Sequence, residues 1–312
     1  MRLGIHANVL YAIGGVFGIL VLATLVVWLL KRSRPGANLG ELERRVRSWW
    51  VMVVVFAVAL ALNRMVSLAF FCLISLLAFR EYVSLIPTRQ ADRRVLFWAT
   101  FSIPVQYWWI GYDWYGMFIV WIPVFIFLAL PLRMVLIGET QGFLRAAGTV
   151  HWGLMMTVFA LSHIAALLVL PETGNPRGGG PALVLYVVFL TQFNDVAQYV
   201  WGKLFGRHNV VPTVSPNKTL EGLLGGLVTT TLLAWLLAGL LTPLTLTESL
   251  SAGVMIALGG FIGDVVISAL KRDLSVKDSG ALLPGHGGIL DRLDSLTYTA
   301  PLFFHFIRYT HY

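Results

Sequence analysis

Charged residues and cysteine are both scarce in this chain of 312 residues. Asp, Glu, Lys and Arg together make up 12% of the sequence, whereas soluble domains carry about 25%, and the mean hydropathy is +0.77. No polar stretch approaches the roughly 50 residues of a small soluble domain. The single cysteine, Cys72, cannot form an intrachain disulfide or a cysteine-based zinc site. The composition therefore predicts an all-α, polytopic transmembrane helical bundle.

Apolar segments recur along the whole chain. A helix needs about 20 apolar residues to cross a bilayer, and we expect about nine or ten spans. The candidates are residues 9–30, 49–62, 65–79, 95–111, 115–132, 149–170, 181–201, 221–241, 250–270 and 296–309. Asn63 and Arg64 separate two short runs, either as a polar interruption in one tilted helix or as a tight turn. We predict the turn, and therefore ten spans.

The basic residues distinguish the two sides of the membrane. If the N-terminus lies outside and the chain crosses ten times, one side receives the linkers 31–48, 80–94, 133–148, 202–220 and 271–295. These linkers hold 19 of the 23 Lys and Arg residues. Because basic loops stay in the cytoplasm, this side is predicted to be cytoplasmic. Basic loops beside anionic headgroups also explain the net charge of +8, so no nucleic-acid partner is expected.

The first polar constellation lies in the span 181–201 and just after it. Asp195, Gln198 and Tyr199 share one helical stripe, and Lys203 follows. An acid at the centre of a span costs about 2.5–3.5 kcal/mol on insertion scales, so the stripe predicts a functional polar interior. The alternative is a set of interhelical hydrogen bonds that only holds the bundle together.

The second constellation is the segment 214–222, which reads Val-Ser-Pro-Asn-Lys-Thr-Leu-Glu-Gly. Ser215-Pro216 is typical of a turn, and Thr219 with Glu221 is typical of a helix start. Free amides at that start, together with Ser215, Lys218 and Thr219, predict a phosphate site. The P-loop pattern Gly-x4-Gly-Lys-Ser/Thr is absent, and a simple helix cap explains the segment equally well.

The third constellation begins at Asp264, inside the span 250–270. The glycines before it predict close packing of a neighbouring helix; they are Gly259, Gly260 and Gly263. Its helical stripe continues with the polar residues Ser268, Lys271 and Arg272. One helix face therefore runs from an acid within the span to two cations at the membrane surface.

The linker after this span is rich in acids, cations and glycine. It contains Lys277, Asp278, His286, Gly287, Gly288, Asp291, Arg292, Asp294 and Ser295. Carboxylates such as Asp264 and Asp291 suit Mg²⁺, and the cations suit phosphate oxygens. One histidine, His286, does not predict a zinc site. A basic cytoplasmic loop with incidental acids is the alternative, but it explains neither the acids nor the Gly-His-Gly-Gly turn.

Residues 268–294 resemble the signature of the CDP-diacylglycerol synthases, or phosphatidate cytidylyltransferases. That signature is Ser-x-x-Lys-Arg, four residues, Lys-Asp, a small residue, and then Pro-x-His-Gly-Gly-x-x-Asp-Arg-x-Asp, and each position is filled here. The resemblance extends to Gly263-Asp264, 215–222, 195–203 and Phe79-Arg-Glu-Tyr82, and covers roughly 43–312. We interpret 1–48 as an added transmembrane helix with a basic linker. Residues 49–312 are then a cytidylyltransferase-like membrane domain whose catalytic part is 190–295.

The resemblance implies transfer of a cytidylyl group from CTP to phosphatidate, giving CDP-diacylglycerol and pyrophosphate. It implies Mg²⁺ held by Asp264 and Asp291, in a paired-metal site whose second ion can be K⁺. The residues expected to hold substrate phosphates are Ser215, Lys218, Lys271, Arg272, Lys277 and Arg292. Those expected to shape the site are Asp195, Asp278, His286 and Asp294. Further candidate substrate contacts are Tyr199, Lys203, Thr219, Ser268, Gly287 and Gly288.

The implied partners are CTP, phosphatidate and the bilayer of a bacterial inner membrane, with the active site facing the cytoplasm; a homodimer is compatible with this set. Two positions depart from the family pattern: Ile267 stands where Glu is common, and residues 194–199 read Asn-Asp-Val-Ala-Gln-Tyr. Two other functions stay open. A CTP-dependent polyprenol or dolichol kinase would transfer the γ-phosphate and release CDP. A cation-coupled transporter would use the intramembrane acids without consuming CTP.

Overall fold

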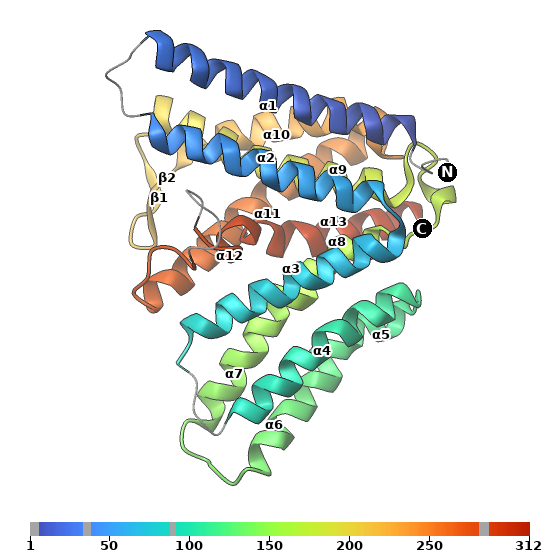
Figure 1. The fold of residues 1–312 in the computed structure, drawn as a ribbon, viewed down its shortest axis with the longest axis vertical. Coiled ribbons are helices and arrows are strands. Elements are labelled where there is room, and N and C mark those ends of the chain that lie inside the picture. Colours follow the sequence, from blue (N-terminus) through green and yellow to red (C-terminus); the bar gives the residue numbers. More distant parts are fainter. Residues whose placement is uncertain (1–5, 34–38, 88–91, 281–286) are drawn as a thin grey trace.

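The protein is a helical bundle in a computed structural model that describes residues 6–33, 39–87, 92–280 and 287–312. The α-helices are α1 (Ala7–Ser33), α2 (Gly40–Ala61), α3 (Arg64–Leu85), α4 (Arg93–Gly111), α5 (Tyr115–Val120), α6 (Phe127–Val135), α7 (Phe143–Leu154), α8 (Ala160–Leu167), α9 (Gly179–Phe205), α10 (Leu220–Leu241), α11 (Leu246–Asp273), α12 (Leu290–Leu293) and α13 (Leu296–His311). Two short strands, β1 (Asn209–Val211) and β2 (Ser215–Thr219), form an antiparallel hairpin. The predicted all-α bundle is confirmed (Figure 1).

The predicted spans all fall on helical segments of the described chain. Two π-helical segments, Trp121–Ile126 and Met155–Phe159, make α5–α6 and α7–α8 continuous. Seven of the helical segments are long and apolar enough to cross a membrane, which confirms a multi-pass architecture. The predicted turn is also present, because Asn63 caps α3 by accepting a hydrogen bond from the Val66 N–H (3.0 Å).

Different helix termini and connecting segments lie at the two ends of the bundle. The C-terminal ends of α1, α3, α6, α9 and α11 lie at one end, together with α12 and the β-hairpin (Figure 1). The start of α1 and the end of α13 lie at the opposite end. The linkers that hold most of the basic residues therefore leave the bundle on one side.

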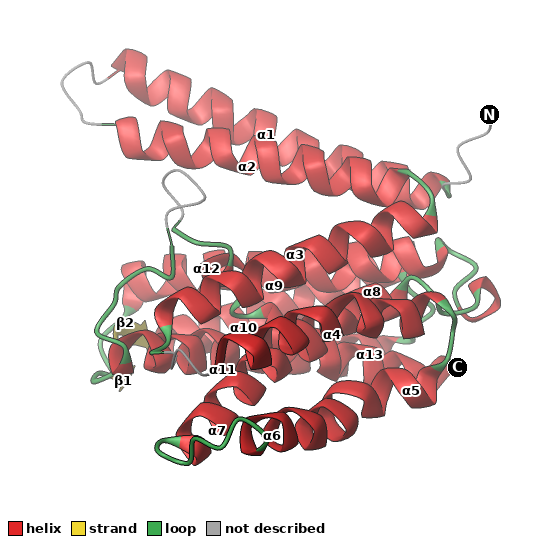
Figure 2. Cartoon of the chain, turned by 60° about the horizontal axis from the view of Figure 1, so that its bottom comes forward, coloured by secondary structure: helices red, strands yellow, loops and turns green. Residues whose placement is uncertain are grey.

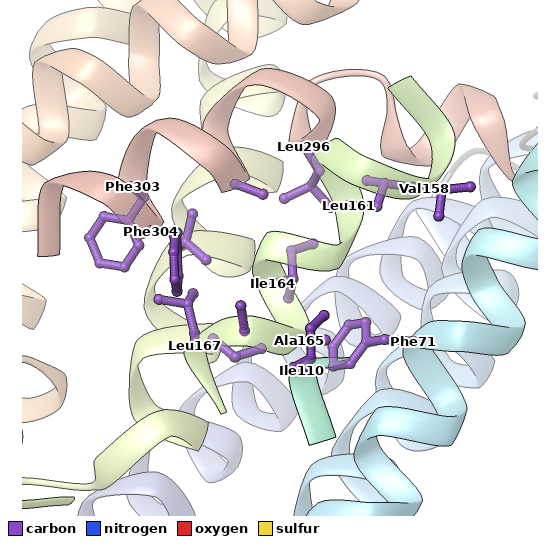
Figure 3. Packing of buried hydrophobic residues seen from close by; sticks show 14 of the residues in the cluster. Phe71, Ile110, Val158, Leu161, Ile164, Ala165, Leu167, Leu296, Phe303 and Phe304 are labelled. Carbon is purple, nitrogen blue, oxygen red and sulfur yellow. The ribbon is translucent and has the colours of Figure 1, made fainter. Parts of the chain in front are cut away.

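The centre of the bundle is packed around α8, whose eight residues are all buried. Figure 3 shows Ile164 and Leu167 of α8 between Phe304 of α13 and Phe71 of α3. A helix that is apolar all round is stable only when other helices surround it. This core joins the N-terminal and C-terminal halves of the chain into one body that supports the site.

Close approach between helices positions the C-terminal part of the bundle. A Cβ added at Gly263 would lie 2.5 Å from the carbonyl oxygen of Asp294, and one at Gly222 would lie 2.7 Å from that of Gln198. The predicted close packing beside Asp264 is thus confirmed. It places α11 directly against the joint between α12 and α13.

The helices α1 and α2 form an antiparallel pair at one margin of the bundle (Figure 2). Lys31 and Glu43 form an exposed ion pair between them (3.2 Å), and the Trp50 indole donates a hydrogen bond to Thr24 Oγ1 (3.0 Å). The domain boundary predicted after residue 48 falls within α2. This helix is therefore shared between the two predicted parts of the chain.

Candidate active site

The intramembrane acid Asp264 is joined to the β-hairpin. Lys218 of β2 forms an ion pair with it, and Ser268, one turn along α11, donates a hydrogen bond to Asp264 Oδ1 (3.2 Å). Burial by itself lowers the pKa of Lys218, but the carboxylates of Asp264 and Asp195 outweigh this effect and raise the pKa above its usual value. Two of the three predicted constellations therefore meet at this pair.

The second acid–lysine pair lies between α11 and α12. Lys271 Nζ is 2.9 Å from Asp291 Oδ1, and the N–H groups of Ser279 and Gly288 donate to Asp291 Oδ2 at 2.8 and 3.0 Å. Burial raises the pKa of Asp291, but these hydrogen bonds and the Lys271 charge together lower it below its usual value. Gly287 beside it has φ +77°, a conformation that favours glycine.

Glu81 of α3 holds the segment that carries Asp291. The Ser279 hydroxyl donates to one of its oxygens, and the N–H groups of Ile289 and Leu290 donate to its carboxylate at 2.9 and 3.0 Å. A side chain at Gly288 would clash with the same carboxylate. One acid from the N-terminal half thus orders both the 279 side and the 289–290 side of this segment.

A cluster of acids lies at the joint between α12 and α13. The Ser295 hydroxyl donates to Asp195 Oδ1 (3.1 Å), and the Ser295 N–H donates to Asp294 Oδ1 (2.8 Å). Burial, and then repulsion from Asp264 and Asp195, raise the pKa of Asp294 well above its usual value. Three carboxylates from α9, α11 and the α12–α13 joint are therefore close enough to repel one another.

These groups face one cavity of about 940 Å³. The predicted site residues that line it are Asp195, Tyr199, Ser215, Lys218, Thr219, Asp264, Lys277, Asp278, Gly287, Asp291, Arg292 and Asp294. Arg292 Nε and Gln198 Nε2 are buried and have no hydrogen-bond partner among the described residues. Buried donors of this kind are costly unless a ligand or water accepts from them, so both are available to an acceptor in the cavity.

Some of the predicted site residues do not line the cavity but lie next to it or on the surface of the bundle. Ser268, Lys271 and Gly288 contact the two acids as described, and Arg272 donates to the Val214 carbonyl (3.1 Å). The Lys203 ammonium lies 5.9 Å from the centre of the Tyr199 ring on the exposed side of α9. His286 lies outside the described residues.

Of the positions where the chain departs from the family pattern, Ile267 and Asn194 are outside the cavity wall, whereas other residues of the segment 194–199 line it. Ile267 is fully buried in the hydrophobic core. Asn194 donates to the Ala257 carbonyl (3.2 Å) and accepts from the Thr230 hydroxyl (3.0 Å). On α9, Asp195 therefore lines the cavity, while the neighbouring Asn194 forms hydrogen bonds to other helices.

The segment 215–219 is a strand, which corrects the predicted turn at Ser215-Pro216. β2 pairs with β1 in the register Asn209 to Thr219, and the chain turns earlier, at residues 212–214. Thr219 caps α10 as predicted, accepting a hydrogen bond from the Gly222 N–H (3.2 Å). The strand pairing is what directs Lys218 toward Asp264.

The N-terminal part of α2 supplies a wall of the cavity that the sequence did not predict. The lining residues from this helix are Glu41, Arg44, Arg45 and Trp49. A signal was present, because the run 49–62 is too short to cross a bilayer alone. Its helix had to begin several residues earlier, which places Arg44 and Arg45 on it.

The donor set of the cavity suits a divalent cation that arrives with phosphate. Among the residues with described positions, no three His, Cys, Asp or Glu side chains form a ready-made metal cage. Mg²⁺ usually takes one or two carboxylates and completes its shell with waters and substrate phosphates. Asp264 and Asp291 both line the cavity, and their hard oxygens fit that requirement.

The fold and the cavity define a polytopic membrane protein with a cavity lined by acids and cations at one end of its bundle. Residues 43–310 match the model of the cytidylyltransferase family, and the chain belongs to that family. The expected resemblance is confirmed at this level.

Relatives of this chain fall into two groups. An uncharacterized protein of Escherichia coli (strain K12), YnbB, is 49% identical over 296 residues, which cover 95% of this chain and 97% of that protein. A phosphatidate cytidylyltransferase of Staphylococcus haemolyticus is 39% identical over 127 residues, 40% of this chain and 49% of that enzyme. Another, from Staphylococcus saprophyticus, is 36% identical over 157 residues, 49% of this chain and 59% of that enzyme. The chain thus spans about half the length of these named enzymes.

Proposed function

We propose that the protein transfers a cytidylyl group from CTP to phosphatidate. An oxygen of the lipid phosphate attacks the α-phosphorus of CTP, and a new P–O bond forms. The bond from the α-phosphorus to the oxygen bridging to the β-phosphate breaks, and pyrophosphate leaves with that oxygen. One observation carries the proposal: a single cavity in a membrane bundle of this family gathers Lys218–Asp264, Lys271–Asp291 and Arg292 from segments far apart in sequence.

The main difficulty of this reaction is the approach of two polyanions. Lys218, Lys277 and Arg292 line the cavity, and the unpartnered Arg292 Nε is a donor for a phosphate oxygen. The nucleophile is already largely an anion, because the second pKa of a phosphate monoester is about 6. The site therefore needs fixed positive charge for transition-state stabilisation, and we assign no general base.

Mg²⁺ is part of the proposal, with K⁺ as a candidate second ion. Asp264 and Asp291 would hold the metal, and bound Mg²⁺ would supply charge neutralisation at the phosphates. Lys218 and Lys271 form ion pairs with these two acids, and both acids line the cavity. Asp195 and Asp294 lie beside them, and a bound cation would relieve the repulsion among these carboxylates.

The position of the cavity suits substrates from two phases. The basic linkers leave the bundle at the end where the β-hairpin and α12 lie (Figure 1), and such linkers face the cytoplasm. We therefore place the cavity at the cytoplasmic face of a bacterial inner membrane. CTP would enter from the cytoplasm while the acyl chains of phosphatidate stay in the bilayer.

Two labels on CTP test the proposal. Purified protein is supplied with Mg²⁺, phosphatidate and CTP labelled either in the cytosine ring or at the γ-phosphate, and the lipid is then extracted. Ring label in the lipid phase with release of pyrophosphate is the expected result. With a polyprenol as the lipid, γ-label in the lipid and free CDP would instead identify a lipid-alcohol kinase. No CTP consumption, together with cation flux in sealed vesicles, would identify a transporter.

A further inference from the structure

A second cavity lies between the α1–α2 pair and α9. It has a volume of about 80 Å³ and almost wholly apolar walls. Ile13 and Val16 of α1 form one side, Val53 of α2 another, and Val188 and Phe189 of α9 the third. Its walls therefore come from three helices, two of which are apolar enough to span a membrane.

This apolar slot is adjacent to the cavity that holds the candidate active site. Trp49 of α2 and Gln192 of α9 line both spaces, so one end of the slot borders the polar site. From Trp49 to Ala57, which also lines the slot, is about 12 Å along the helix axis. The hydrocarbon depth of one leaflet is about 15 Å, so the residues of α2 that line the slot extend along the helix over a distance similar to that depth.

The helix α1 is held against the bundle by polar contacts near both of its ends. Asn8 Nδ2 donates to the Arg177 carbonyl (2.8 Å) at one end, and Lys31 pairs with Glu43 of α2 at the other (3.2 Å). The Phe17 and Trp50 rings pack together between these points, with centroids 5.7 Å apart. α1 is thus a fixed wall, although it precedes the residues that match the family model.

From these observations we infer that the slot binds one acyl chain of the lipid whose phosphate lies in the catalytic cavity, with α1 as its outer wall. The inference rests on the proposed function for the identity of the lipid. Burial of the methylenes of an acyl chain in an apolar slot lowers the free energy of the bound lipid. Trp49 and Gln192, which line both spaces, mark the boundary between the acyl chain and the headgroup. The added N-terminal helix would then select among acyl chains.

A matched pair of α2 variants tests the slot. Val53→Phe places a phenyl ring in the slot, whereas Val55→Phe makes the same change at a position that is 48% exposed on the outer face of the helix. Displacing about two methylenes weakens binding about tenfold. We expect Val53→Phe to raise the KM for a dioleoyl phosphatidate about tenfold and to leave the KM for CTP and for dihexanoyl phosphatidate within twofold. Val55→Phe should change none of these values.

A variant in the opposite wall of the slot distinguishes a blocked slot from a folding defect in α2. Val16→Phe on α1 should reproduce the chain-length effect. Equal losses with long and short lipids in both slot variants, no loss with either lipid, or an effect of Val55→Phe as large as that of Val53→Phe, would overturn the inference.

A second measurement does not depend on turnover. Dioleoyl-length phosphatidate with a diazirine in one acyl chain is crosslinked to the wild-type protein in liposomes, and labelled peptides are identified by mass spectrometry. Label at 13–16, 53–57 or 188–189 that Val53→Phe reduces supports the slot, and label confined to lipid-facing positions overturns it. If the wild type makes no CDP-lipid from any phosphatidate, the proposed function fails, while the crosslinking result still decides whether the slot holds an acyl chain.

Discussion

The contact most open to a decisive test is the one between Glu81 and the segment that carries Asp291. Glu81→Ala removes the acceptor for the Ser279 hydroxyl and for the N–H groups of Ile289 and Leu290. Glu81 belongs to α3, far from the cavity residues in sequence, and it does not line the cavity. The substitution therefore changes the support of the site without removing a group that touches substrate.

The expected magnitude follows from these hydrogen bonds. A hydrogen bond to a charged group contributes about 1.5–3 kcal/mol, but water would replace part of the loss because Glu81 is only half-buried. We take about 3 kcal/mol as the net free energy by which the substitution destabilises the ordered form of the segment. Since 1.4 kcal/mol corresponds to a factor of ten, the population of the ordered form should fall about 100-fold, and kcat should fall with it. Unfolding of the whole bundle should change little, because the core around α8 is untouched.

The assay is CDP-lipid formation by purified protein, with kcat and the KM for CTP measured separately. Glu81→Gln keeps the shape and one carbonyl acceptor, so its loss should be smaller, about tenfold. Glu172→Ala is the control, because Glu172 is exposed and does not line the cavity. If Glu81→Ala keeps kcat within threefold of the wild type, the hydrogen bonds of Glu81 do not position Asp291, and the reasoning is wrong.

Four further predictions concern the cavity and its packing. Asp264→Asn and Asp291→Asn should each lower turnover by at least about 100-fold in a folded protein; near-normal turnover in either would remove that acid from the site. Arg44→Ala should raise the KM for one anionic substrate about fivefold, the effect of about 1 kcal/mol, and an unchanged KM for both would exclude a substrate role. Chelation by EDTA should abolish activity and added Mg²⁺ restore it; activity that survives EDTA refutes the metal proposal. Gly263→Val should lower the free energy of unfolding by about 1–3 kcal/mol, because its Cβ would lie 2.5 Å from the Asp294 carbonyl oxygen; an unchanged melting curve would contradict this.

Local patterns in the sequence predicted most of the helices and part of the site. Apolar runs predicted helices at ten places, and seven of the described helical segments are long and apolar enough to cross a membrane. Apolar runs carry this signal because each span must satisfy its backbone hydrogen bonds within one segment. The helix cap at Thr219 and the turn at Asn63 were also predicted, since capping depends on residues only a few positions apart. The strand at 215–219 was not, because its pairing depends on residues 209–211 and on its position beside α9 and α11.

The sequence by itself determined that this is a multi-pass helical protein whose polar groups gather in three constellations, because length, hydropathy and charge act locally along the chain. Only the tertiary structure decided which side chains meet. Asp264 pairs with Lys218 and Asp291 with Lys271, Glu81 supports the latter from α3, and α2 closes the cavity with Arg44 and Arg45. These contacts join residues up to about 200 positions apart, and helix packing, which depends on the shapes of all the neighbours at once, sets them.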